Sequence, residues 1–152
     1  MSNTFKQVSI DHGWKDLEKT FKDMNGAYTK VGLPNEALVA DGDATLSELQ
    51  VRAFTHEFGS PKMNIPERSF MRPAFDDNAN NIAIKSQYYA GQIADGKMTI
   101  NTGLAKIGEF MTNQIKSYIT AVANPPLKIR IGGNPLVDSS QLRNSFTHVE
   151  VL

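Results

Sequence analysis

The stretch FDDNANNIAIKSQYYAGQIADGKMTINTGLAKIGEFMTNQIKSYITAV, residues 75–122, determines the fold, because apolar side chains recur along it with the period of an α-helix. Its first half has a series with spacings of 4, 3, 4, 3 and 4: Phe75, Ala79, Ile82, Ser86, Tyr89 and Ile93. Its second half has a similar series: Leu104, Ile107, Met111, Ile115, Tyr118 and Val122. Asp95-Gly96 ends the first series and Pro125-Pro126 the second, so the pattern predicts two long helices.

A third helix is predicted near the start of the chain. Its apolar stripe has spacings of 4, 3, 4 and 3: Ile10, Trp14, Leu17, Phe21 and Met24. Ser9 or Asp11 can cap it, and Asn25-Gly26 can end it. We expect the stripe to face the core, with contact to another subunit as the alternative. The spacing also allows a longer helix that ends at residues 32–34.

A fourth helix is predicted after Thr45. Thr45 and Glu48 have the spacing of a capping box, in which each side chain accepts a hydrogen bond from a free backbone N–H. The predicted buried face holds Leu46, Leu49, Ala53 and Phe54. Gly59-Ser60-Pro61 should end this helix. The following stretch KMNIPERSFMRP has two prolines and should be irregular, and Arg72 is disfavoured in a helix because Pro73 follows it.

Short stretches with a period of two predict strands. Residues 27–33 can be extended, residues 127–131 alternate, and Thr147, Val149 and Val151 alternate before the end. Asp138 can cap a short helix or turn just before that last strand. The predicted fold class is therefore α+β: about four helices packed on a small, mostly antiparallel sheet in a single domain. Its parts are an N-terminal helix (1–26), a central body (27–131) and a C-terminal turn and strand (132–152).

Composition excludes several classes of protein. The 152 residues suit one domain, and 16 basic against 16 acidic residues give a formal net charge of zero, which argues against a non-specific nucleic-acid binder. Cysteine is absent, so disulfides, thiol catalysis and Cys-ligated zinc are excluded. The first residues lack the apolar core of a secretory signal, and no apolar run reaches 18 residues, so we expect no membrane partner.

The sequence contains no recognisable catalytic pattern. His56-Glu57 suggests a zinc protease, but the second histidine of that motif would fall at Ser60, and Glu57 is better explained as a salt bridge or helix-end charge. Asp76-Asp77 point about 100° apart on a helix and are expected to be solvated charges. Gly132-Gly133 lacks the spacing of a phosphate-binding loop. We therefore predict no catalytic, cofactor-binding or metal-binding residues, and not an enzyme.

One segment is more specific than these periodic patterns. Residues 53–75, AFTHEFGSPKMNIPERSFMRPAF, resemble a signature of head–tail connector, neck and tail-completion proteins of long-tailed bacteriophages. The end of the chain agrees, because residues 135–145 resemble the Pro-Leu-hydrophobic-Asp-Thr-Gly-x-Leu-x-x-Ser motif of that family, with Ser139-Ser140 in place of Thr-Gly. The matching positions that we expect to be structural are Glu57, Phe58, Gly59, Ile65, Pro66, Leu136, Asp138 and Leu142.

The resemblance implies a structural virion protein without catalytic residues. Such proteins form rings, here six- or twelve-fold, at the neck between the portal and the tail tube. They extend the DNA channel and join the tail to the head, beside other neck, portal-adaptor and tail-terminator proteins. Genomic DNA passes through the lumen without specific binding. The implied location is the virion, after synthesis in the host bacterial cytoplasm.

The segment around Phe70 is the candidate subunit interface. It is stiffened by proline and has residue types that are enriched at interfaces: Arg68, Phe70, Met71, Arg72 and Pro73. An equal alternative is that Phe70 and Met71 anchor the loop in the subunit's own core, and a third is that Arg68 or Arg72 pairs with Glu57. Alternatives for the whole protein are a tail terminator or minor tail protein and, more distantly, a small enzyme or adaptor domain.

Overall fold

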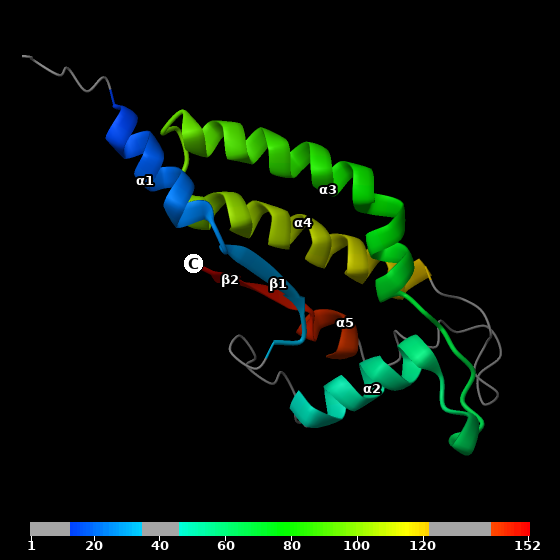
Figure 1. The fold of residues 1–152 in the computed structure, drawn as a ribbon. Coiled ribbons are helices and arrows are strands. Elements are labelled where there is room, and N and C mark those ends of the chain that lie inside the picture. The colour runs from blue at the N-terminus through cyan, green and yellow to red at the C-terminus, as the bar shows by residue number, and fades with distance from the viewer. Residues whose placement is uncertain (1–12, 35–45, 122–140) are drawn as a thin grey trace, which may run out of the picture.

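The computed structural model describes residues 13–34, 46–121 and 141–152. Four long helices, a short helix, a 3-10 turn and a two-stranded sheet make up these ranges (Figure 1). In chain order they are α1 (Trp14–Met24), β1 (Tyr28–Gly32), α2 (Leu46–Phe58), η2 (Pro61–Met63), α3 (Met71–Ala94), α4 (Ile100–Ala121), α5 (Gln141–Ser145) and β2 (Thr147–Val151). The predicted α+β class, with helices on a small antiparallel sheet, is confirmed.

The two long predicted helices form an antiparallel hairpin, in which α4 lies between α3 and the sheet (Figure 1). Asp95 and Gly96, the latter at φ 69°, end α3 as the sequence predicted. The helix begins at Met71, however, so the expectation that Arg72 is not helical is wrong. Pro73 falls in the first turn, where its missing N–H costs nothing, and a side chain from α2 accepts the N–H groups around it.

The sheet pairs the two strands nearest the ends of the chain. Strands β1 and β2 are antiparallel, with Tyr28 opposite Val151 and Gly32 opposite Thr147. The extended conformation of β1 replaces the alternative of one longer helix, because Gly26 takes φ 89° directly after α1. The strand predicted over 127–131, the cap at Asp138 and the capping residue Thr45 lie outside the described residues.

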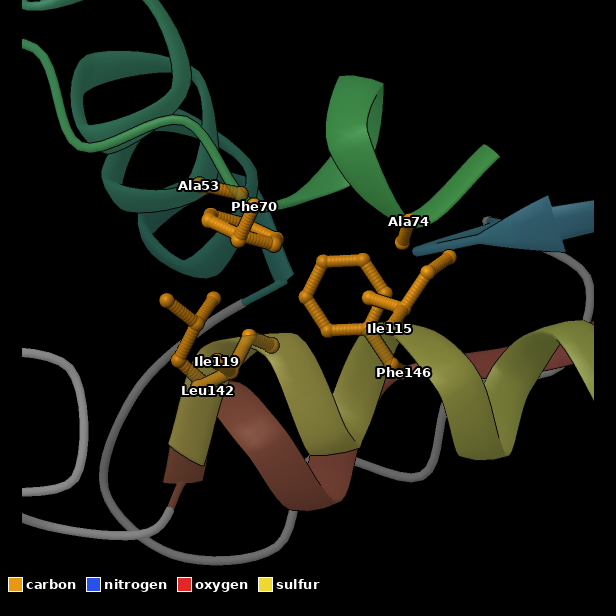
Figure 2. Close-up of a cluster of buried hydrophobic side chains, with 7 residues drawn as sticks. All are labelled: Ala53, Phe70, Ala74, Ile115, Ile119, Leu142 and Phe146. Carbon is orange, nitrogen blue, oxygen red and sulfur yellow. The ribbon is translucent and has the colours of Figure 1, made fainter. Parts of the chain in front are cut away.

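The core joins segments that are distant in the sequence (Figure 2). Phe70 and Phe146 meet edge to face at its centre, with ring centroids 5.6 Å apart and planes at 88°. The surrounding side chains come from α2, α3, α4 and α5: Ala53, Ala74, Ile115, Ile119 and Leu142. Four helices are therefore held together by one apolar cluster beside the start of α3.

One predicted buried face is exposed instead, and a second is buried only in part. Helix α1 has no buried residue, and Trp14 and Phe21 are 69% and 55% exposed, so the expectation of a core-facing helix is wrong. Within the described residues the helix packs mainly against the far end of α3, through a narrow side that includes half-buried Leu17 and Met24, and Met24 also lines a pocket with residues of α4. On α2, Phe54 is 65% exposed, although Leu49 and Ala53 are buried as predicted. No helix in the described ranges is long and apolar enough to cross a membrane.

Candidate functional site

The carboxylate of Glu57 organises the junction between α2 and α3. It sits in the last turn of α2 and is only 3% exposed. Its Oε2 accepts hydrogen bonds from the backbone N–H groups of Phe70 and Met71, each at 2.9 Å. Its Oε1 accepts the backbone N–H of Arg72 at 3.0 Å and the hydroxyl of Ser69 at 2.7 Å. Glu57 thus caps α3 from a neighbouring helix, which the first free N–H groups of a helix require.

This arrangement keeps Glu57 ionised. Burial by itself raises the pKa of the carboxyl group, but the hydrogen bonds from Met71, Phe70, Ser69 and Arg72 outweigh it and lower the pKa from 4.5 to about 2. The positive end of the α3 dipole favours the same charge. A carboxylate that is anionic and accepts five hydrogen bonds has no free lone pair for acid–base catalysis.

Arg72 closes the junction from the solvent side. Its Nε donates to Glu57 Oε1 at 3.1 Å, and its Nη2 donates to the main-chain oxygen of Glu57 at 2.9 Å. The same Nη2 pairs with the exposed carboxylate of Glu67, and the guanidinium lies 5.2 Å from the ring centroid of Phe58. The third alternative for this segment, an ion pair with Glu57 inside the subunit, is confirmed for Arg72.

The loop between α2 and α3 folds back tightly, and Gly59 makes this possible. Its φ is 71°, and a Cβ at this position would lie 2.8 Å from the backbone nitrogen of Glu67 and 3.0 Å from the oxygen of Ile65. Ser60 and Ile65 form an isolated antiparallel bridge, and Arg68 donates its N–H to the oxygen of His56 at 2.7 Å. Only glycine combines this φ with such a close approach.

The five candidate interface residues differ widely in exposure. Phe70 and Arg68 are 0% and 4% exposed, so Phe70 anchors the segment within its own core and neither side chain is presented to a neighbour in this conformation. Met71 packs beside the core and Pro73 is half-buried, whereas the side chain of Arg72 is 52% exposed. Among these five, an interface role remains a prediction chiefly for Arg72.

The residues matched by the resemblance also fall into place around this junction. Glu57 and Gly59 shape it as described, and Ile65 is bridged to Ser60 across the turn. Phe58 is 51% exposed beside Arg72, and Pro66 is exposed on the loop. Leu142, 6% exposed, belongs to the core. Leu136 and Asp138 lie outside the described residues.

An open apolar groove of about 550 Å³ runs between α2 and α3, next to the Glu57 junction. We call it the α2–α3 groove. Three aromatic side chains dominate it: Phe54, Phe58 and Phe75, which are 65%, 51% and 38% exposed. The rings of Phe54 and Phe58 lie with their centroids 4.7 Å apart and their planes tilted by 45°. Polar groups line the rim: Gln50, Arg72 and Asp76. Its size suits a ligand or an inserted side chain, and the described residues that line it include no Ser, Thr, Cys, Lys or His.

Sequence reasoning missed this groove. The spacing of Phe54 and Phe75 placed both on predicted core-facing stripes, because periodicity reports which residues share a face and not what covers that face. Asp76 was expected to be a solvated charge, and it is exposed on the rim. The one available signal was the excess of aromatic residues in 54–75 over what one short helix buries.

A second polar cluster lies on the other side of α4, where β2 crosses it. His148 Nδ1 is 3.3 Å from the hydroxyl of Thr112, and its Nε2 is 3.5 Å from Glu150 Oε1. Its ring lies against Gly108, where an added Cβ would be only 2.7 Å away. Thr112 is 5% exposed and cannot reach a substrate, so this cluster packs the strand onto the helix.

The described residues contain no group of three or more His, Cys, Asp or Glu side chains that could hold a metal ion. Burial, together with the charges of Arg68 and Arg52, lowers the pKa of His56 below its usual value. The site is therefore an exposed aromatic groove beside the Glu57 junction.

Comparison with known proteins gives one partial relative. An uncharacterized protein of Methanocaldococcus jannaschii is 39% identical over 75 residues, which cover 40% of this chain and 56% of that protein. The chain therefore matches little more than half the length of this relative, whose name states no activity. No family model matches the chain, and no solved structure matches it.

Proposed function

We propose that this chain is a structural virion protein of a tailed bacteriophage. It forms a ring at the head–tail neck, extends the DNA channel and joins the tail to the head. Neighbouring neck, portal-adaptor and tail-terminator proteins are its partners, and genomic DNA passes through the ring. The observation that carries the proposal is the convergence of the signature residues Glu57, Gly59 and Arg72 on one rigid junction beside an open aromatic groove.

The chemistry of this junction supports a structural role. Glu57 and Arg72 pair with each other and bond to the backbone of the junction. These bonds fix the angle at which α2 meets α3. The groove beside it exposes Phe54 and Phe58, aromatic residues of the kind that anchor protein–protein contacts. A subunit that must hold its neighbours at a fixed angle needs both features.

The test is a stop codon early in the gene, within its phage or prophage, followed by electron microscopy of the lysate. We expect DNA-filled heads lying apart from complete tails, and a plasmid copy of the gene should restore infectious particles. A synonymous codon change at the same position is the control. Tails of uncontrolled length would identify a tail terminator instead. Normal particles would refute a virion role.

A further inference from the structure

Helix α1 presents aromatic side chains to solvent on its outward side. Phe21 and Trp14 are 55% and 69% exposed and lie two helical turns apart, about 10.5 Å along the axis. Glu18 and Lys22 lie beside them, with 51% and 73% of their side chains exposed, and bond to each other at 2.8 Å. We call these four residues the α1 ridge. Its position on a projecting helix makes it available to another molecule (Figure 1).

The α1 ridge and the α2–α3 groove lie at opposite ends of α3. Met24, at the end of α1, lies near Tyr89 and Ile93 late in α3, whereas the groove is lined by Met71, Arg72 and Phe75 at its start (Figure 1). The 24 residues of α3 extend about 36 Å. One subunit therefore cannot insert its own ridge into its own groove in this fold, but two subunits arranged head to tail can do so.

The charges on the two surfaces match. On the ridge, acidic Glu18 is followed one turn later by basic Lys22. On the groove rim, basic Arg72 is followed one turn later by acidic Asp76. In each pair the two residues are four positions apart on one helix, so the two pairs have the same spacing. A helix α1 laid parallel to α3 places Glu18 by Arg72 and Lys22 by Asp76. The same alignment brings Phe21 to the half of the groove that holds Phe54 and Phe75.

We propose that the occupant of the α2–α3 groove is helix α1 of a second copy of this chain. The contact joins two different patches of the subunit, so it is heterologous and propagates from copy to copy until a ring closes. It specifies which surfaces meet in the assembly, and to that extent it rests on the proposed ring function. Phe21 is the anchor, and the two charge pairs set the direction of the helix.

Because the chain has no cysteine, single cysteines report this contact directly. Asn25→Cys follows the ridge, and Val51→Cys, a 62% exposed site next to groove-lining Gln50, marks the groove. The two full-length variants, one with a mass tag, are mixed at about 0.5 mM with a short bis-maleimide cross-linker. Ile84→Cys, 57% exposed on the middle of α3, replaces Val51→Cys as the matched control.

We expect the Asn25–Val51 heterodimer to form at least about tenfold faster than the Asn25–Ile84 heterodimer. Phe21→Ala should remove this preference. Asp76→Lys should also reduce it, and Lys22→Glu added to Asp76→Lys should restore part of it. Circular dichroism of each variant establishes that it is folded. Equal rates for the two pairs would overturn the proposal, and so would preferential linkage of Val51→Cys subunits to each other, which indicates a symmetric groove-to-groove dimer.

This outcome is independent of the stop-codon experiment. If head-to-tail cross-links form while the stop codon leaves normal particles, the contact stands and the virion function fails. If no cross-link is preferred while heads and tails remain separate without the protein, the function stands and another partner occupies the groove.

Discussion

Replacing Glu57 by glutamine tests the central structural claim, that one buried carboxylate holds α2 against the start of α3. The carboxylate accepts five hydrogen bonds, three at Oε1 and two at Oε2. Glutamine has the same shape, but one of its two terminal atoms is a donor. If the amide nitrogen takes the place of Oε2, two donors of the junction face its N–H groups, and if it takes the place of Oε1, three donors do.

The expected cost follows from these lost bonds. Each buried donor without an acceptor costs about 1–3 kcal/mol, and breaking a buried charge pair costs about 3–5 kcal/mol when both groups are fully buried. Arg72 is half exposed, so we expect Glu57→Gln to lower the free energy of unfolding by about 3 kcal/mol. For a domain of this size that lowers the melting temperature by roughly 6–12 °C.

Urea unfolding followed by circular dichroism measures this change, and Glu67→Gln provides the matched control. Glu67 contacts the same guanidinium of Arg72 but is 54% exposed and accepts no N–H of the helix start among the described hydrogen bonds. Its replacement should change the free energy of unfolding by less than about 0.5 kcal/mol. If Glu57→Gln costs under about 1 kcal/mol, or no more than Glu67→Gln, then the Glu57 cap does not stabilise the junction between α2 and α3.

Three further predictions concern stability. The pKa of Glu57 is about 2 in the folded chain against 4.5 in the unfolded chain. The ionised carboxylate therefore stabilises the fold fully above about pH 5, and this contribution, at most about 3 kcal/mol, is lost as the pH falls toward 2. The free energy of unfolding, measured over this acid range, should depend less on pH in Glu57→Gln than in the unmodified chain. Gly59→Ala should lower the free energy of unfolding by at least about 2 kcal/mol, because the added Cβ meets backbone atoms and φ is positive. Gly91→Ala, whose Cβ would enter open space on α3, should raise the free energy of unfolding by about 0.5–1 kcal/mol. Equal melting temperatures for the two variants would contradict this. Phe70→Ala should cost about 3–5 kcal/mol by leaving a cavity in the core, and Phe54→Ala under about 1 kcal/mol by chemical denaturation; the reverse order would show that the two burial assignments are exchanged.

The burial of Phe70 decides between two alternatives that the sequence leaves open. As a residue of a proline-stiffened segment it was a candidate for an interface, with an equal alternative in the core. Its partner Phe146, between α5 and β2, is more than 70 residues away along the chain, so no local pattern around Phe70 could decide between the two. We now expect the subunit interface to include residues that remain exposed, above all Arg72 and Phe54.

The Glu57 junction illustrates what could be inferred without a structure and what could not. The sequence excluded the zinc motif at His56-Glu57 and favoured a salt bridge for Glu57, and an ion pair with Arg72 is present. That the same carboxylate caps α3 was not predictable, because the usual capping residue lies beside the helix it caps. Here the cap comes from another helix, 13 to 15 residues before the N–H groups it accepts.

By itself, the sequence determined the elements: the 3.6-residue period of α3 and α4, the turn at Asp95-Gly96 and the alternation in β2 are local properties of neighbouring side chains. Only the tertiary structure decided which apolar faces become core. Helix α1 has an apolar stripe as regular as that of α3, yet Phe21 stays exposed because no other element of the described chain packs over that side of the helix. Periodicity fixes the direction of a face, whereas burial depends on which distant segments reach it, and that depends on how the whole chain packs.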